Sequence, residues 1–322
     1  MINNIKKNIF SRIKKVFFYI IYYPKYILLK ISGESDEIIT IIDGGLGSQM
    51  SQYAIGQEIQ HISGIQVSYD LTWYEKNGKD IYGKENRFFE LEKIFPNIKI
   101  KKASKEKVNI YKKLFNKQKN GKNIQNLDEL IFKSSPATKP IYLGGYWSSQ
   151  IYTNYNLDNL RKNFTFSLSL DENNNKMLEK IISASCSVAI QIRMGDYIGS
   201  TLEVITQNYF KNAIEYIIKN VSITNINFFI FSTDSENAKK MLPLLSNNYT
   251  FVNINKNDNG AYDMYLMSHC HHFIISNSTF GFWPALLSNR SDKKIVIQPD
   301  KWLNTDTERL SSKYPCWIMM QC

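Results

Sequence analysis

The second half of the chain alternates short apolar runs with stretches of helical period, and this alternation predicts its architecture. The apolar runs are rich in β-branched and aromatic residues and have the length of buried strands; they lie at 187–193, 227–232, 251–254, 272–276 and 294–298. Stretches whose apolar residues recur every three or four positions lie between and around them, at 176–183, 208–219, 236–244, 261–270 and 279–287. Such alternation is typical of a doubly wound parallel sheet. We therefore expect a Rossmann-like lobe over residues 175–322.

A shorter pattern of the same kind opens residues 33–174. An apolar strand at 38–42 is followed by the glycine-rich turn GGLG, a helix at 48–61 and a second strand at 65–69. This is a βαβ unit with its loop at the carboxyl end of the first strand, where glycines let a ligand or another lobe approach the backbone closely. The spacing matches neither GxGxxG nor a P-loop. We expect an N-terminal α/β lobe that faces the second lobe across a cleft.

Residues 1–32 have a different pattern. Their apolar residues recur at steps of three and four, and residues 1–31 hold seven Lys or Arg and no acid, which predicts a basic amphipathic helix. The apolar run 16–23 ends at Pro24, far short of the roughly 20 residues that span a bilayer. We expect this segment to lie on an anionic membrane surface, with packing on the protein itself as the alternative.

The net charge of +11 comes from two short stretches. Residues 1–31 are one, and residues 98–123, with ten lysines and a single glutamate, are the other. A nucleic-acid-binding protein spreads its basic charge over a folded face with aromatic residues among it, so we do not expect a nucleic-acid partner. The Lys-rich stretch 99–122 is typical of a solvated face, although it could also contact phosphate or membrane.

The sequence offers little for a metal ion. The four cysteines form no CxxC pair, which suits a reducing compartment. His269, Cys270, His271 and His272 are adjacent, but they fall where a helix ends and a strand begins, so their side chains should point in different directions. No Asp-x-Asp occurs, which disfavours a metal-dependent diphosphate site. We therefore expect no metal and no cofactor.

Polar residues follow three of the predicted strands of the second lobe, at Arg193 and Asp196, at Ser232 and Asp234, and at Asn277, Ser278 and Thr279. The last group precedes a helix, so it is either a plain N-cap or a seat for a diphosphate at the positive helix end. Arg193 facing the same crevice favours the diphosphate, because a guanidinium and a helix N-terminus together neutralise it. A structural Arg193–Asp196 pair that closes a turn is the alternative for that strand end.

Five motifs in order resemble one family. They are GGLGSQMSQYA (44–54), GYWSSQIY (145–152), QIRMGDY (191–197), FSTD (231–234) and YDMYLMSHCHHFIISNSTFGFW (262–283). Together they are similar to glycosyltransferase family 11, the α-1,2-fucosyltransferases of bacterial surface-polysaccharide pathways and of animals. The resemblance implies a two-lobed GT-B-like α/β fold, GDP-fucose as the donor, no metal, and inversion at the anomeric carbon.

The resemblance also implies the donor-site residues. Arg193 would bind the β-phosphate, and Asn277, Ser278, Thr279 and Phe280 would complete the donor site. The loop with Gly44, Gly45, Gly47 and Gln49 would close on the donor. The motif residues Gln191 and Asp234 would also belong to the donor site. Asp263 would read guanine N–H groups, with an ordinary solvent-facing helix aspartate as the alternative.

The chemistry needs further residues whose assignment the sequence leaves open. Asp43 and Asp196 are both candidates for the base that takes the acceptor proton. Tyr146 and Trp147 either stack on an acceptor sugar ring or anchor a domain edge.

This chain departs from the family pattern at several positions. The family has His where Gln191 stands and a second Arg where Met194 stands, as well as Asn for Ser48, Phe for Ser51 and Gly for Pro284. Proline lacks an N–H and suits a helix start, so we expect the last helix to begin later than residue 279.

We expect a metal-independent inverting fucosyltransferase on the cytoplasmic face of a bacterial inner membrane, acting on a galactose-type 2-hydroxyl of a lipid-linked, O-antigen-like glycan. The alternatives are a transferase of the same fold with another nucleotide sugar, and a non-catalytic sugar- or nucleotide-binding relative.

Overall fold

The computed structural model describes residues 2–33, 38–76, 78–79, 86–115, 140–144, 157–243, 248–255, 259–305, 314 and 317–322. The chain forms two compact units. The first consists of Met1–Gly45, Ser51–Phe89 and Lys99–Trp147, and the second of Leu46–Met50, Glu90–Ile98 and Ser148–Cys322. The division expected from the sequence, 33–174 and 175–322, is simpler than these units, because two short early segments pack within the second unit.

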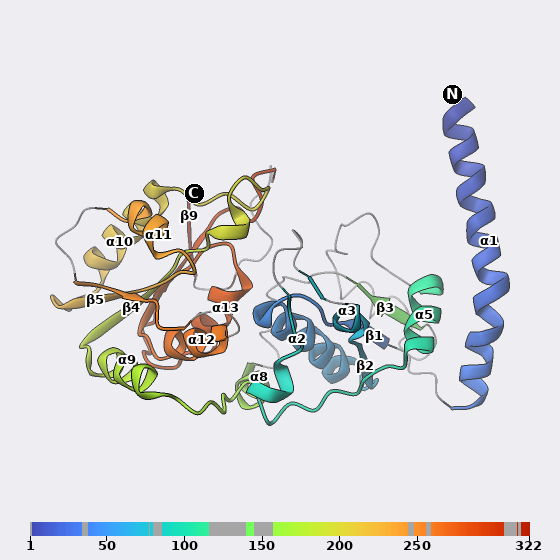
Figure 1. Ribbon diagram of the computed structural model, residues 1–322, viewed down its shortest axis with the longest axis horizontal. Coiled ribbons are helices and arrows are strands. Elements are labelled where there is room, and N and C mark those ends of the chain that lie inside the picture. Colours follow the sequence, from blue (N-terminus) through green and yellow to red (C-terminus); the bar gives the residue numbers. More distant parts are fainter. Residues whose placement is uncertain are drawn as a thin grey trace. The chain divides into compact units, whose positions relative to one another are not determined.

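The second unit is built on a six-stranded parallel sheet (Figure 1). Its strands are β4 (Cys186–Gln191), β5 (Ile226–Phe231), β6 (Asn248–Val252), β7 (His272–Ile274), β8 (Val296–Pro299) and β9 (Ile318–Met320). Their spatial order is β6-β5-β4-β7-β8-β9. Counted from β4, this is the order 3-2-1-4-5-6 of a Rossmann fold, so the predicted doubly wound sheet is confirmed. The edge strand β9 was not predicted.

Helices cover both faces of this sheet (Figure 1). They are α9 (Glu172–Ser183), α10 (Gln207–Asn220), α11 (Ser235–Met241), α12 (Gly260–Ser268) and α13 (Thr279–Leu287). Successive side chains of a strand point to opposite faces, so Val188 packs in the cluster that holds α10, whereas Ala189 packs in the cluster that holds α12. This unit also contains α4 (Leu91–Ile94), α8 (Leu157–Asn163) and the 3₁₀ turn η1 (Gly195–Tyr197).

The first unit has a three-stranded parallel sheet in the order β2-β1-β3. Its strands are β1 (Ile38–Ile41), β2 (Val67–Asp70) and β3 (Ile141–Leu143), and α2 (Leu46–Ser63) connects the first two. The predicted βαβ unit is therefore confirmed. Two further helices follow β2, the short α3 (Thr72–Glu75) and α5 (Lys105–Leu114), so part of the Lys-rich stretch is helical.

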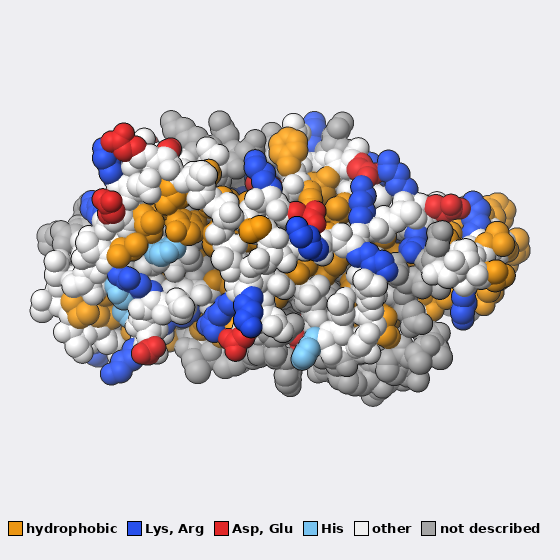
Figure 2. Space-filling view, turned by 90° about the horizontal axis from the view of Figure 1, so that it is seen from below, with side chains coloured by type: hydrophobic (Ala, Val, Ile, Leu, Met, Phe, Trp, Pro, Cys, Tyr) orange, Lys and Arg blue, Asp and Glu red, His pale blue; other side chains and the backbone are white. Residues whose placement is uncertain are grey.

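The N-terminal helix α1 (Ile2–Ile31) continues through Pro24, where its apolar run was expected to end. It packs on α5 of the same unit, because Tyr26 is buried against Tyr111 and Phe115, with ring centroids 6.1 and 4.9 Å apart. The opposite side of α1 stays exposed, and Figure 2 shows hydrophobic side chains with lysines beside them at the right-hand end, where α1 lies. Within the described residues, no helix combines the length and apolar content that crossing a bilayer requires.

Candidate functional site

The second unit has a topological switch point between β4 and β7. These strands are parallel neighbours, and the chain leaves β4 toward β5 on one side and β7 toward β8 on the other. In open α/β sheets, the crevice beyond the carboxyl ends of two such strands is where ligands bind. Arg193 follows β4, and Asn277, Ser278 and Thr279 follow β7, so the structure brings two of the three predicted polar groups to this crevice.

Ser276 holds the two strand ends together. Its hydroxyl donates to the backbone oxygen of Gln191 over 2.8 Å, and its N–H donates to Oε1 of Gln191 over 3.1 Å. The same Oγ accepts a hydrogen bond from the N–H of Arg193 over 3.1 Å. Ser276 is buried and Gln191 nearly so. The backbone at Arg193 is therefore fixed relative to the residues that follow β7.

The guanidinium of Arg193 lies over the ring of Tyr197, with 5.2 Å between Cζ and the ring centroid. The hydroxyl of Tyr197 donates to the backbone oxygen of Asn277 over 3.4 Å. Stacking on an aromatic face orients a guanidinium while leaving its charge intact. Arg193 is only partly buried, so a cation with a defined orientation stands at the edge of the switch point.

Asn277 has a structural task. Its side chain is buried, and its Nδ2 donates to the backbone oxygens of Leu202 and Trp302 over 2.9 and 2.7 Å. The amide therefore ties two loops to the end of β7. Within the described chain its Oδ1 is buried without a hydrogen-bond partner. An unsatisfied buried acceptor costs free energy, so a hydrogen-bond donor that reached this oxygen would stabilise the complex.

Ser278 is the N-cap of α13, because its side chain accepts a hydrogen bond from the N–H of Phe280 over 3.2 Å. The N-cap alternative for this group is therefore present in the structure, and the diphosphate seat at the same helix end stays a prediction. The expectation of a later helix start is wrong: α13 begins at Thr279 and contains Pro284. The N-cap bond of Ser278 fixes the start of the helix. Pro284 lies in the second turn, and the helix continues there without the N–H that proline lacks.

Gly47, the last glycine of the glycine-rich turn, packs on the start of α13, and both belong to the second unit. A Cβ on Gly47 would lie 2.7 Å from the carbonyl carbon of Thr279 and 2.8 Å from the nitrogen of Phe280. The indole N–H of Trp283 donates to the backbone oxygen of Gly47 over 2.9 Å. The predicted close approach of a glycine is thus a backbone-to-backbone contact. Gln49 is buried and accepts from the N–H of Glu90 over 2.9 Å.

Asp43 follows β1 in the first unit, and Gln52 holds it twice. Its N–H donates to Oε1 of Gln52, and Nε2 of Gln52 donates to its Oδ1, both over 2.8 Å. Gly44, the next residue, has a φ of +74° and accepts from the hydroxyl of Tyr74 over 3.0 Å. The carboxylate is therefore fixed in orientation. The other candidate base, Asp196, lies in η1, and its side chain is outside the described residues.

Asp234 is the N-cap of α11. It accepts from the backbone N–H and from Nδ2 of Asn237 over 3.1 and 2.7 Å. The backbone N–H of Asn237 lowers the pKa of Asp234, because it stabilises the charged form. The carboxylate is thus occupied locally, and its predicted contact with the donor stays a prediction.

Asp263, in the first turn of α12, is partly buried and accepts from Nδ2 of Asn255 over 2.8 Å. Asn255 in turn exchanges hydrogen bonds of 3.0 Å with Asn174. Burial raises the pKa of Asp263 to about 7, although the bond from Asn255 opposes the shift. Asp263 is thus partly buried and hydrogen-bonded, and its predicted contact with guanine stays a prediction.

The histidine cluster divides as its position predicted. Nδ1 of His271 lies 2.8 Å from the hydroxyl of Ser187, whereas Nδ1 of His272 accepts from the N–H of Ile295 over 3.1 Å. Nδ1 of His269 lies 2.9 Å from the backbone oxygen of Tyr265. Over the described ranges, no three His, Cys, Asp or Glu side chains gather in a group that could hold a metal ion.

Three residues that shape the site had no predicted role: Ser276, Tyr197 and Gln52. Ser276 carried a usable signal, because it directly precedes Asn277 at a strand end. Tyr197 contacts Asn277, 80 residues along the chain, and Gln52 contacts Asp43, 9 residues before it; nothing in the local sequence indicates either contact. Tyr146 and Trp147, the acceptor-side candidates, lie outside the described residues.

Comparison with known proteins gives this geometry a context. Residues 37–321 match the model of the family described as Glycosyl transferase family 11. An α-1,2-colitosyltransferase of Escherichia coli is 30% identical over 306 residues, 88% of this chain and 99% of that protein. The O-antigen biosynthesis glycosyltransferase WbnK of Escherichia coli is 35% identical over 133 residues, 38% of this chain and 42% of that protein.

Among solved structures, the fucosyltransferase NodZ from Bradyrhizobium has a TM-score of 0.53 at 14% identity, covering 79% of this chain and 92% of its own. A structure of NodZ α-1,6-fucosyltransferase co-crystallised with GDP has a TM-score of 0.52 at 12% identity, covering 79% and 93%. At such identity the likeness concerns the fold alone. It confirms the α/β, GT-B-like fold class that the sequence motifs implied.

Proposed function

The chain belongs to glycosyltransferase family 11, and from this premise we propose that it transfers L-fucose from GDP-fucose to the 2-hydroxyl of a galactose-type acceptor in bacterial surface-glycan synthesis. One observation carries the proposal: Arg193 and the start of α13 meet at the switch point of a 3-2-1-4-5-6 sheet. The GDP in the NodZ co-crystal structure supports a GDP-linked donor, and the colitosyltransferase relative supports an α-1,2 linkage.

That relative also favours a second candidate within the same reaction class. Its name specifies a colitosyl residue as the group transferred, and it aligns over nearly its whole length with this chain. The sugar of the donor could therefore be colitosyl in place of fucosyl. The two candidates share the diphosphate, the linkage and the site.

The proposed reaction is a direct displacement with inversion. The acceptor oxygen attacks the anomeric carbon as the bond from that carbon to the β-phosphate oxygen breaks, and GDP leaves with the electron pair. Negative charge grows on the diphosphate in the transition state. Arg193 and the N–H groups at the start of α13 are placed to stabilise it, in an arrangement that needs no reorganisation.

The acceptor proton needs a base within reach. Asp43 and Asp196 are the two candidates. The bidentate hold of Gln52 on Asp43 supports Asp43, because a base must keep one orientation toward the acceptor hydroxyl. Comparison of Asp43→Asn with Asp196→Asn decides between them, because only the variant of the true base loses transfer and keeps GDP binding.

Asp263 is proposed to accept the N1–H and N2–H groups of guanine. Its position beside Asn255 supports this role, because a partly buried carboxyl with a raised pKa gains most from two N–H donors. Gln191, Gly44, Gly45, Gly47, Gln49, Asp234 and Phe280 keep their predicted places around the donor as part of this proposal.

We propose no metal and no cofactor for the reaction, since Arg193 and the start of α13 would supply the positive charge that a diphosphate needs. EDTA treatment tests this part: turnover should stay unchanged, and a loss that Mg²⁺ or Mn²⁺ restores would contradict it.

The proposed location is the cytoplasmic face of the inner membrane, where a lipid-linked glycan acceptor is available. The exposed side of α1 supports this, because Phe17, Ile20, Leu28 and Ile31 form an apolar face opposite the Tyr26 contact. Lys25 is exposed beside it, as in helices that lie on anionic membranes. Sedimentation with anionic vesicles, compared for the full chain and for Leu28→Glu/Ile31→Glu, tests the location.

One experiment tests the proposed function as a whole. The full chain is incubated with GDP-fucose, with the nucleotide-linked colitosyl donor and with other nucleotide sugars, together with galactose-terminated acceptors. GDP release and product mass are measured. A fucosyl or colitosyl product supports the corresponding candidate; a different transferred sugar, or GDP binding without turnover, contradicts both.

A further inference from the structure

A hollow in the first unit has a composition that the proposed reaction does not yet use. Trp73, Lys76, Gly78 and Lys79 line it, and its volume is about 470 Å³. The indole of Trp73 is partly exposed, and Lys76 and Lys79 are exposed. A Cβ on Gly78 would overlap the Trp73 ring, so the glycine lets the backbone support the indole directly. An aromatic face thus lies beside two ammonium groups.

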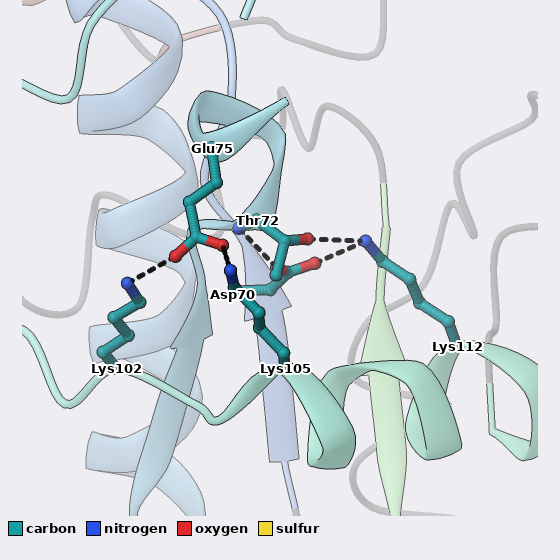
Figure 3. Close-up of polar contacts among 6 residues, drawn as sticks. All are labelled: Asp70, Thr72, Glu75, Lys102, Lys105 and Lys112. Atoms are coloured by element: carbon teal, nitrogen blue, oxygen red, sulfur yellow. Dashed lines mark hydrogen bonds and ion pairs between the residues drawn. The ribbon is translucent and has the colours of Figure 1, made fainter. Parts of the chain in front are cut away.

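Two acidic residues described in this part of the unit, Glu75 and Asp70, are already paired with lysines (Figure 3). Glu75 of α3 pairs with Lys102 and Lys105, with N–O distances of 2.7 and 3.0 Å. At the end of β2, Asp70 is fully buried and pairs with Lys112 over 2.6 Å. Within the described chain, neither Lys76 nor Lys79 has an ion-pair partner. As far as the described residues go, their charge is available to a bound ligand.

The same contacts hold α3 in place. Asp70 accepts from the N–H of Thr72 over 2.8 Å and from the hydroxyl of Tyr142 over 2.7 Å, and Nζ of Lys112 reaches Oγ1 of Thr72. The Glu75 pairs hold the other end of this short helix. Figure 3 shows three lysines of the Lys-rich stretch pointing at α3 from both sides. A side chain positions a ligand most precisely when the element that carries it is held rigidly, as α3 is here.

The hollow also lies on the edge of the sheet that carries the candidate base. Asp43 follows β1, and Trp73 follows the neighbouring parallel strand β2, so both stand at the carboxyl ends. Tyr74 packs edge-on against Trp73, with ring centroids 5.0 Å apart, and its hydroxyl donates to Gly44, next to Asp43. A saccharide bound in the hollow would therefore lie at the same edge of the sheet as the carboxylate of Asp43.

We propose that this hollow is an acceptor subsite for an anionic saccharide. One sugar ring stacks on the indole of Trp73, and its carboxylate or phosphate binds the ammonium groups of Lys76 and Lys79. This deepens the proposed function, on which it rests for the identity of the bound molecule as an acceptor. Sugar rings present an apolar face to an aromatic ring, and lysine is a point charge suited to either anion.

Binding is measured on the full chain without any nucleotide sugar, by ligand-observed NMR. The probes are methyl galactoside, methyl galacturonoside and galactose 1-phosphate, which differ in charge and in the anion. The wild type should bind at least one anionic probe about tenfold more tightly than the neutral one, and high salt should remove the difference. The uronate and phosphate arms show which anion the subsite takes.

Variants locate the subsite. Lys76→Gln/Lys79→Gln should abolish the preference for the anion, whereas Trp73→Ala and Gly78→Ala should weaken all three probes. Lys99→Gln is the matched control, because Lys99 is exposed in the same unit. Circular dichroism checks folding. If Trp73→Ala unfolds, the variant of the exposed pair Lys76 and Lys79 still tests the proposal. Equal binding of neutral and anionic probes, or a double variant that binds as the wild type does, overturns the proposal.

The two proposals fail separately. If no nucleotide sugar is turned over but the lysine variants still lose the anionic probe, the subsite holds and the transferase proposal fails. If transfer occurs and the lysine variants leave acceptor KM and probe binding unchanged, the reverse is true.

Discussion

Ser276 and Gln191 join the ends of β7 and β4 through two hydrogen bonds, one to the backbone oxygen of Gln191 and one to its Oε1, over 2.8 and 3.1 Å. A Cβ on Gly281 would lie 2.8 Å from the same Oε1, so the amide is confined as well as bonded. In this chain the residue at 191 therefore holds the switch point together.

Gln191→Leu should destabilise the fold. The leucine offers no acceptor to the buried N–H of Ser276, and an unsatisfied buried donor costs about 1–3 kcal/mol. Urea denaturation measures the loss. Gln207→Leu is the control: Gln207 is exposed on α10 and its Nε2 donates to the backbone oxygen of Lys240 in an exposed hydrogen bond, so its substitution should cost less than that of Gln191. Equal losses for the two variants would contradict the structural role.

Arg193→Ala should lower kcat for GDP release in transfer by roughly 10²–10³-fold, because one preorganised charge contact to the transition state is removed. Arg193→Lys should recover part of the rate, since lysine keeps the charge but not the planar fork. Steady-state kinetics give the rates, and the thermal midpoint should stay that of the wild type. Arg290→Ala, an exposed arginine of the same unit, is the control. Near-normal turnover in Arg193→Ala would remove it from the site.

Gly47→Ala should lower the free energy of unfolding by about 1–3 kcal/mol, because its Cβ would meet the backbone of Thr279 and Phe280, which cannot move aside as a side chain can. Gly45→Ala in the same turn is the matched control for stability. A Cβ there meets nothing within 4 Å, and its φ is −82°. The pair of denaturation curves should differ; identical midpoints would show that the turn does not pack on α13.

The stability of the free protein should depend on pH through Asp263. Its pKa is raised by burial to about 7 in the folded chain, against 3.8 when unfolded, so the folded state binds more protons between these values. The free energy of unfolding should therefore fall by roughly 2–4 kcal/mol from this group as pH rises from about 4 to about 7. Asp263→Asn should remove that part of the slope. Urea titrations at several pH values compare the two proteins.

GDP affinity should have the opposite dependence. If guanine N–H groups require the charged form of Asp263, GDP binds more tightly as pH rises toward 7, with release of a proton. Calorimetry in buffers of different ionisation enthalpy measures the proton. In Asp263→Asn, both the affinity and its pH dependence should fall. A wild-type affinity that is flat across the window would place guanine elsewhere.

The sequence predicted the elements of the second unit well, because each buried strand is an apolar run with polar residues at its end. It missed β9, a three-residue strand with two methionines at the sheet edge, where composition carries little strand signal. The apolar run 16–23 ends at Pro24, but the helix continues through this residue to Ile31, and Tyr26, just beyond the proline, packs on α5.

For the site, the strand-end rule indicated Arg193 and the residues after β7, since parallel strands bring their carboxyl ends to one edge. It could not indicate what those side chains touch. Asn277 was expected at the donor, yet its amide ties two loops 75 and 25 residues away. Lys112 was predicted only as part of the Lys-rich stretch and Asp70 had no predicted role, because only the fold pairs them.

The bond between Trp283 and Gly47 joins residues 236 positions apart. During synthesis, the segment Leu46–Met50 leaves the ribosome long before α13, the helix it packs against, has been made. The second unit therefore cannot complete its core until nearly the whole chain is available, and a nascent chain stopped before residue 279 should leave that segment open to protease. Limited proteolysis of stalled chains of increasing length would show protection of residues 46–50 only after α13 has emerged.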